Sequence, residues 1–160
     1  MKYIAWVMVV LLVASLFGVG YVYLTATMQV EGVSVIAVEA ATQPELFESL
    51  RRQQQDGLVQ GTAYTSEPLS GPENYQFYTY TVRLKNNCFL TADMVEVQVT
   101  PMDGDVLQIG DAIPKALASH TTGDIQATIL TAMGMHAVRE INVTYYMWGI
   151  PFFLRTTYGQ

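Results

Sequence analysis

The segment Met133-Gly134-Met135-His136 has the residue types that are best suited to hold a metal ion. Two thioethers and an imidazole are ligands that a soft cation such as Cu(I) prefers. Met102 or Met147 would complete the ligand set if the fold brought one of them close. The alternative is a turn between two strands, whose methionines close one end of the core. Met133, Met135 and His136 are the candidate metal ligands, and we expect no other cofactor.

Residues for nucleophilic catalysis do not form a recognisable set. His120 and His136 are the two histidines, and Ser119 stands beside His120. Adjacent residues in an extended chain point to opposite sides, so Ser119 and His120 are not expected to act as a pair. Cys88 is the single cysteine, which excludes an intramolecular disulfide and lacks an activating neighbour. We therefore expect that the protein is not an enzyme.

Aromatic residues are the third candidate for function. The chain has ten tyrosines, more than one small core readily buries. Tyrosine and tryptophan are favoured at protein interfaces, so the sequence predicts a partner-binding patch made of Tyr78, Tyr80, Tyr146 and Trp148. The alternative is cross-strand pairing of these rings within a sheet.

Alternating side chains predict that these candidates lie on short β-strands. In the segment 75–85, Tyr78, Tyr80, Val82 and Leu84 share one parity, as expected for a strand with one buried face. The same alternation recurs around 95–99, 125–129, 141–147 and 152–156, and residues 106–109 are expected to form a further strand, with turns at Asn86-Asn87, Asp103-Gly104 and residues 149–151. Asn142 begins a glycosylation sequon that this pattern places inside a strand.

One segment changes from strand to helix periodicity. After a first strand near 33–38, residues 43–56 repeat apolar side chains at helical spacing, with Pro44 in the first turn and Gly57 as the stop. Thr42 and Glu45 have the spacing of a capping box. Several short strands separated by turns predict a mainly β fold, an antiparallel immunoglobulin-like sandwich with one short inserted helix.

The first residues form an apolar segment. Residues 4–24 carry no formal charge, and a helix of that length spans roughly 30 Å, the thickness of a hydrocarbon core. A secretory signal has an apolar region of about 7–15 residues followed by small residues at the cleavage site, and neither feature is present here. We predict a retained signal anchor; the alternative is a cleaved peptide and a secreted domain.

Flanking residues predict how the anchor lies. Aromatic side chains bracket it, and Lys2 supplies positive charge before it, whereas the next basic residue is Arg51. The positive-inside rule then places residues 1–3 in the cytoplasm and the domain outside, at the cell envelope. Ala14 and Gly18 form a small-xxx-small pair that allows two spans to associate, although small residues are also common in spans generally.

Composition limits the class of partner. Hydrophobic residues make up 51% and charged residues 14% of the 160 residues, and all fourteen acidic residues follow position 30. With Lys2 set aside, the outer part has seven basic and fourteen acidic residues, a net charge of −7. Such a surface repels phosphate backbones, so we expect no nucleic-acid binding.

The region from residue 78 to residue 114 resembles small bacterial immunoglobulin-like sandwich domains of the FxLYD and LEA14-like kind. The residues that carry the resemblance are Val82 to Asn87, Ala92 before the valines of the next strand, and Asp103 to Val106. The resemblance implies a sandwich fold and no particular activity.

Together these observations predict a cytoplasmic tail at 1–3, a membrane anchor at 4–24, a linker at 25–32 and a sandwich domain at 33–160. The function expected is a membrane-tethered, extracytoplasmic binding or structural module, in contact with a protein partner or with a second copy of the chain. A copper-binding envelope protein that uses Met133, Met135 and His136 is the alternative.

Overall fold

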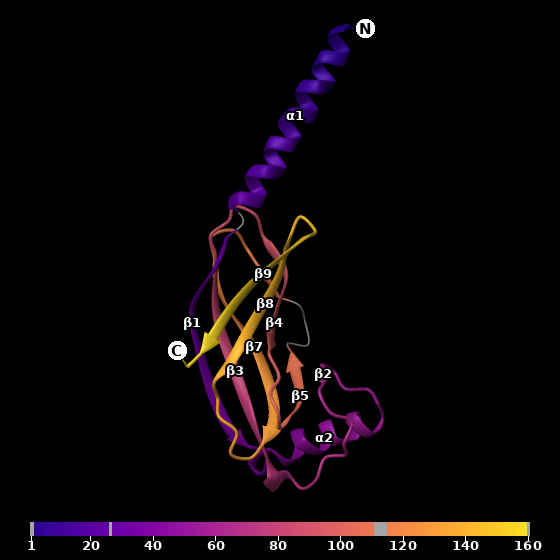
Figure 1. The fold of residues 1–160 in the computed structure, drawn as a ribbon, viewed down its shortest axis with the longest axis vertical. Helices are drawn as coiled ribbons and strands as arrows, with labels where there is room; N and C mark the ends of the chain where they lie inside the picture. The colour runs from indigo at the N-terminus through magenta and orange to yellow at the C-terminus, as the bar shows by residue number, and fades with distance from the viewer. Residues whose placement is uncertain (1, 26, 111–114, 160) are drawn as a thin grey trace.

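The computed structural model describes residues 2–25, 27–110 and 115–159. Helix α1 (Lys2–Thr25) is followed by a β-sandwich and projects from one end of it as a separate rod (Figure 1). The fold is mainly β, with two antiparallel sheets, so the predicted sandwich is confirmed.

Five strands form the first sheet, sheet A, in the order β1-β3-β7-β5-β2. Its long central members pair over eleven positions, from Tyr75 opposite Ala132 to Lys85 opposite Thr122. The strands of sheet A are β1 (Met28–Glu39), β2 (Thr62–Ala63), β3 (Tyr75–Asn86), β5 (Asp105–Gly110) and β7 (Thr122–Ala132).

Four strands form sheet B, in the order β6-β4-β8-β9. Strands β8 and β9 make a hairpin in which Met147 pairs with Ile150 across a two-residue turn. The strands of sheet B are β4 (Ala92–Val99), β6 (Lys115–Leu117), β8 (Arg139–Met147) and β9 (Ile150–Tyr158).

The core lies between the two sheets and is built from the parities that the alternation predicts. Strands β3, β4, β7 and β8 bury alternate residues along most of their length, whereas β5 buries four consecutive residues from Asp105 to Gln108. The buried apolar area supplies most of the driving force for folding. The confirmed inward-facing residues are Tyr78, Tyr80, Val82 and Leu84 of β3, Val95, Val97 and Val99 of β4, and Ile125, Ala127 and Ile129 of β7.

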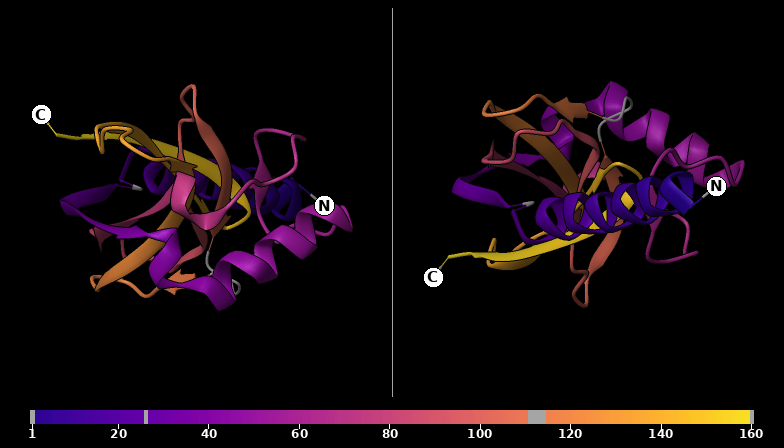
Figure 2. Two further views of the ribbon diagram at one scale, coloured as in Figure 1. Left: turned by 90° about the horizontal axis from the view of Figure 1, so that it is seen from below. Right: turned by 90° about the horizontal axis from the view of Figure 1, so that it is seen from above.

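Helix α2 (Pro44–Gln55) lies outside the two sheets (Figure 2) and confirms the predicted helix. Its buried residues Phe47 and Leu50 pack with Phe77, Leu107 and Leu130 of sheet A in a second apolar cluster. The capping box is wrong, because Gln43 is the N-cap residue and makes no side-chain cap hydrogen bond. The Thr42 hydroxyl instead donates to the carbonyl of Glu39, 2.7 Å away, and closes the 3₁₀ turn η1 (Ala40–Thr42).

Two predicted boundaries are corrected. Residues 28–32 belong to β1 and not to a linker, since Met28 is buried and pairs with Asn86. A bulge between Val30 and Gly32 shifts the register there, which hides the alternation from the sequence. The β8–β9 turn is Trp148-Gly149, one residue earlier than expected, and Pro151 lies in the edge strand β9, where a missing N–H is tolerated.

The sandwich has two different ends. Strands β1, β4, β7 and β9 begin at the end that meets α1, which we call the proximal end (Figure 1). The opposite, distal end carries α2, the β4–β5 turn and the loop of residues 133–138 between β7 and β8, which we call the β7–β8 loop.

Candidate functional site

The β7–β8 loop contains the predicted metal ligands, and its backbone is held by side chains from the core. The carbonyl of Met135 accepts hydrogen bonds from the Tyr78 hydroxyl and from Gln76 Nε2, the latter at 3.1 Å. The carbonyl of Ala137 accepts one from the Tyr80 hydroxyl at 2.8 Å. The two buried tyrosines of β3 therefore satisfy loop carbonyls that water would otherwise have to reach.

Arg139, the first residue of β8, holds two further carbonyls of this loop. Its Nη1 donates to the carbonyl of His136 at 2.7 Å and to that of Val138 at 3.0 Å. Four consecutive carbonyls, from Met135 to Val138, thus have side-chain donors. Because the second part of the loop is held in this way, it presents His136 and Val138 to solvent on a fixed backbone.

The same arginine forms a buried ion pair between the two sheets. Arg139 Nη2 lies 2.9 Å from Asp105 Oδ1, and both side chains are 0% exposed. The other oxygen of Asp105 accepts the backbone N–H of Met102 at 2.8 Å. A buried pair costs much desolvation and is favourable only when its geometry and hydrogen bonds are good. Here it joins β5 of sheet A to β8 of sheet B and fixes the loop and the β4–β5 turn together.

Burial affects the protonation of Tyr80 in this cluster. Desolvation is the largest cause that raises the pKa of its hydroxyl, and the charge of Asp105 acts in the same direction, whereas Arg139 lowers it. The phenol therefore stays protonated at neutral pH and keeps donating to the Ala137 carbonyl.

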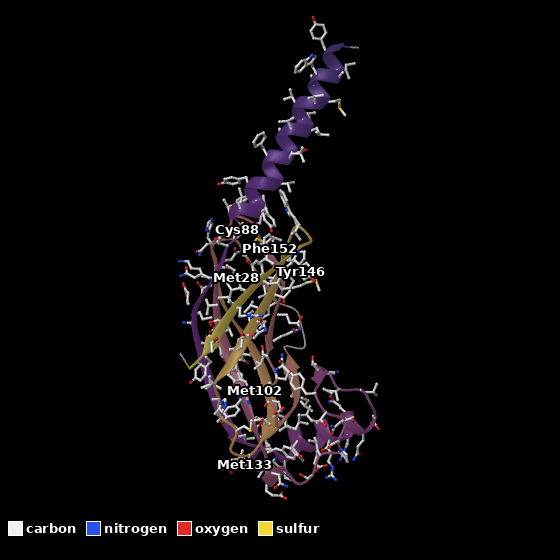
Figure 3. The ribbon with its side chains drawn as sticks, viewed as in Figure 1. Met28, Cys88, Met102, Met133, Tyr146 and Phe152 are labelled. Atoms are coloured by element: carbon white, nitrogen blue, oxygen red, sulfur yellow. The ribbon has the colours of Figure 1, made fainter. Side chains whose placement is uncertain are left out.

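The structure brings only some of the predicted metal ligands together. Met133 and His136 are exposed on the β7–β8 loop, and Met135 packs over the β4–β5 turn, where a Cβ at Gly104 would lie 3.3 Å from its sulfur. Met102 follows β4 and also lies toward the distal end, with Met133 (Figure 3). Met147 ends β8 and is buried near the opposite end of the sandwich, so it cannot join this set.

The part of the chain that the structure describes holds no group of three or more His, Cys, Asp and Glu residues placed for a metal ion. A soft-metal site that uses thioethers stays a prediction.

The predicted tyrosine patch is wrong for two of its four members. Tyr78 and Tyr80 are buried, with rings 6.4 Å apart and hydroxyls bonded to loop carbonyls, so they cannot meet a partner. The core between the sheets is wide enough to take whole tyrosines, which composition alone does not reveal. Tyr146 is half-buried on the outer face of β8, and Trp148 is 65% exposed in the β8–β9 turn.

Trp148 instead belongs to a group of aromatic side chains at the proximal end. Phe89, in the β3–β4 loop, is 49% exposed, and its ring lies 6.2 Å from that of Tyr21 in α1. Tyr23 of α1 lies 5.6 Å from Phe152 of β9. Figure 3 shows Cys88 and Phe152 at this end, near the foot of α1. We call the surface formed by the β3–β4 loop (87–91), the β6–β7 loop (118–121) and the β8–β9 turn (148–149) the proximal rim.

A buried asparagine positions two of the three segments of the proximal rim. Asn86 Nδ2 lies within 2.7–3.1 Å of the carbonyls of Leu90, Leu117 and Ala118, and its Oδ1 accepts the N–H of Cys88 at 2.9 Å. The sequence predicts only a turn at Asn86. Its role depends on the β6–β7 loop, which is distant in sequence, so no local signal reveals it.

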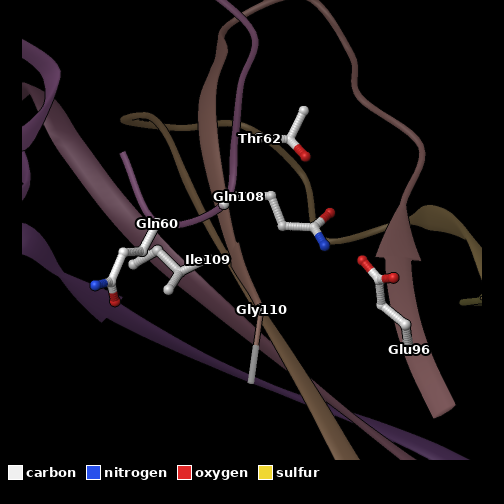
Figure 4. Close-up of a pocket in the computed structure, with 7 residues that line it drawn as sticks. Gln60, Thr62, Glu96, Gln108, Ile109 and Gly110 are labelled. Atoms are coloured by element: carbon white, nitrogen blue, oxygen red, sulfur yellow. The ribbon is translucent and has the colours of Figure 1, made fainter. Parts of the chain in front are cut away.

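A cavity of about 460 Å³ lies between β2 and β5 on one side and β4 on the other (Figure 4). Gln108 and Glu96 face one another there from the two sheets. The Gln108 amide is already used: Oε1 accepts the N–H of Val99 at 2.8 Å and the Tyr64 hydroxyl at 3.0 Å, and Nε2 donates to the Val97 carbonyl at 3.0 Å. Gln108 therefore joins the sheets through both ends of its amide.

The residues considered for nucleophilic catalysis are Cys88, Ser119 and His120, and the structure places each of them differently. Cys88 is buried, and the Ser119 hydroxyl donates to its carbonyl at 3.1 Å. His120 is exposed in the β6–β7 loop with a φ of 55°. The segment is a turn and not the extended chain that the sequence suggests, and the Ser119 hydroxyl is already engaged by the Cys88 carbonyl.

Comparison of the chain with protein-family models and with curated protein sequences finds no match. The resemblance to FxLYD and LEA14-like domains therefore stays a prediction that rests on the residues quoted for it.

Proposed function

We propose that the protein is a membrane-tethered, extracytoplasmic binding module without enzymatic activity. Helix α1 anchors it in the bilayer, and the sandwich stands on the outer surface and presents its distal end to a partner protein. The observation that carries this proposal is the exposure of apolar side chains along α1.

Helix α1 is long and apolar enough to cross a membrane from Tyr3 to Thr25, and only 6% of its most apolar 18 residues are buried against the rest of the chain. Its exposed residues include leucine, valine, phenylalanine and tryptophan on every side of the helix. Removing each such side chain from water is worth about 1.5–3 kcal/mol, so a bilayer is the environment that this helix fits. A helix that is apolar on all sides lies in a protein core or in a membrane.

The last turn of α1 contacts the sandwich and argues for a retained anchor. Val22 is buried, and Tyr21 and Tyr23 contact Phe89 and Phe152. Cleavage after this segment would uncover the apolar surface of Phe89 and Phe152. These contacts favour a chain in which helix and domain stay joined.

The β7–β8 loop supports a binding role at the distal end. A network that includes a fully buried ion pair fixes its backbone, while His136 and Val138 point outward. A rigid scaffold that holds an exposed loop in one conformation reduces the entropy cost of binding a partner.

Extraction of membranes with alkaline carbonate tests the anchor. We expect the wild-type chain to stay in the pellet and Leu11→Arg/Leu12→Arg to be released, because each arginine at the centre of a span costs about 2.5–3.5 kcal/mol. Leu24→Arg, at the exposed end of the helix, is the matched control and should remain in the pellet. Release of the wild-type chain would refute the anchor.

Protease treatment of intact cells tests the orientation. Digestion of the sandwich from outside is expected if the amino terminus is cytoplasmic, and protection in intact cells with digestion in inverted vesicles would reverse the proposed topology.

A further inference from the structure

We infer that the proximal rim rests in the headgroup region of the bilayer, so that Phe89 and Trp148 insert among the lipids beside α1. This inference rests on the proposed anchor and adds a second contact with the membrane. The occupant of the surface is the outer leaflet of the membrane that α1 spans.

Charged residues are distributed unevenly between the two ends of the sandwich. The three segments of the proximal rim, residues 87–91, 118–121 and 148–149, contain no Asp, Glu, Lys or Arg. The distal end, in contrast, carries exposed acidic side chains at Glu39, Glu45, Glu67, Glu73 and Asp103. In a domain with fourteen acidic residues, uncharged loop tips avoid the cost of bringing charge to lipid, and the exposed Asp93 stands behind them as the second residue of β4. The chain therefore has one end suited to a bilayer and one suited to water.

The depth of the proximal rim follows from its contact with α1. Tyrosine and tryptophan concentrate at the level of the lipid headgroups, and Tyr21 and Tyr23 end the apolar helix. Phe89 contacts Tyr21, and Phe152, the third residue of β9, contacts Tyr23. Side chains that touch the headgroup-level tyrosines lie at nearly the same depth. If α1 spans the membrane, the proximal rim cannot stand far from the surface.

Trp148 has a backbone conformation that is unusual for a bulky residue. The β8–β9 turn has positive φ at both residues, 51° at Trp148 and 74° at Gly149, as two-residue hairpin turns commonly require. Asparagine, aspartate and glycine suit the first position, whereas a bulky residue there is strained. A large indole that is kept in a strained and exposed position indicates a contact made outside the folded chain.

Asn86 fixes the β3–β4 loop and the β6–β7 loop relative to each other. Its side chain joins the carbonyls of Leu90, Leu117 and Ala118. The surface is thus formed before it meets lipid, and Phe89 needs little ordering when it inserts.

Tryptophan fluorescence of the full chain in phosphatidylcholine vesicles tests the inference, because the sequence has only Trp6 and Trp148. Trp6→Phe leaves Trp148 as the reporter. Trp148→Phe leaves Trp6, which reports on the anchor. Trp6→Phe/Trp148→Phe/Met133→Trp places a reporter on the exposed β7–β8 loop as the matched control. Each variant is quenched by iodide from the water and by lipids brominated near the headgroup end of their acyl chains.

We expect brominated lipid to quench Trp148 and iodide to quench it several-fold less than the tryptophan at position 133. Trp148 quenched by iodide as strongly as the control, with Trp6 quenched by lipid, would overturn the inference and leave the anchor standing. Protection of Trp148 from both quenchers would also overturn it, since a protein contact would then cover the turn. Trp6 insensitive to brominated lipid would refute the proposed anchor itself.

Discussion

At the scale of single residues, the molecule depends on a few buried polar side chains. Asp105 and Arg139 are the clearest case, since their ion pair is fully buried and joins the two sheets. Arg139 Nε has no hydrogen-bond partner among the described residues, so the pair is not perfectly satisfied. Such a pair is costly to bury and more costly to break.

The first prediction concerns this pair. Arg139→Met or Asp105→Leu alone should lower the free energy of unfolding by about 3–5 kcal/mol, because each leaves an uncompensated buried charge. The double variant should lose clearly less than the sum of the two. Urea unfolding of the full chain in detergent measures all three, and additive losses would show that the two side chains do not act as a pair.

The metal hypothesis is also decided by single side chains. If Met133, Met135 and His136 bind Cu(I), His136→Ala should weaken binding, since it removes the only imidazole of the set. Titration of the purified chain with Cu(I) in the presence of a competing chelator measures the affinity. Equal titrations for the wild type and His136→Ala would end the hypothesis and leave the β7–β8 loop as a structural turn.

At this scale the sequence predicts less than at any other. The parity of Tyr78 and Tyr80 with Val82 and Leu84 is visible in the sequence, and it correctly puts all four on one strand face. Whether a tyrosine on that face is buried depends on the space between the sheets, which local pattern does not contain. Asp105 and Arg139 are separated by 34 positions, so nothing in either neighbourhood indicates that they meet.

At the scale of elements, strands and helices follow the sequence closely because their periods differ. The alternation around β3, β4 and β7 and the helical spacing of α2 predict elements that the structure confirms. The errors lie where backbone irregularity shifts the period. The bulge in β1 hides its first residues, and the Trp148-Gly149 turn moves the hairpin by one residue.

An ion pair between β3 and β7 gives a pH-dependent prediction. Arg83 Nε lies 2.9 Å from Asp124 Oδ1, and this hydrogen bond lowers the pKa of Asp124 below its ordinary value. A carboxyl whose pKa is lower in the folded than in the unfolded chain adds stability above the unfolded value. That stability is lost as pH falls through the folded value. NMR titration of Asp124 should show the lowered pKa, and Arg83→Gln should return it toward the value of a free aspartate; no change would contradict the pairing.

Helix α1 gives a prediction about association. Ala14 and Gly18 are exposed, and a Cβ at Gly18 would have no atom within 4 Å, so a larger residue fits the single chain. Gly18→Leu should therefore leave membrane insertion unchanged and reduce any crosslinked dimer, because it separates two helices that pack through small residues. Crosslinking in membranes measures this, with Leu16→Ile as a control away from the pair. Equal dimer yields in wild type and Gly18→Leu would rule out this contact.

At the scale of the whole molecule, the chain has two chemically different ends. The apolar helix and the uncharged proximal rim form one end, and the acidic distal end with its β7–β8 loop forms the other. Hydropathy and charge patterns along the sequence predict the anchor and its orientation. The strand order brings the three separate loops together into one uncharged surface. Local sequence patterns do not reveal that order, so they do not predict the surface.

The measurement that tests this account most directly is the intact mass of the protein isolated from a membrane fraction. A retained anchor predicts a chain of 17.8 kDa that still contains residues 4–24. A shorter chain that begins after the apolar segment and is released into the medium would contradict the tether, and with it the membrane contact of Phe89 and Trp148.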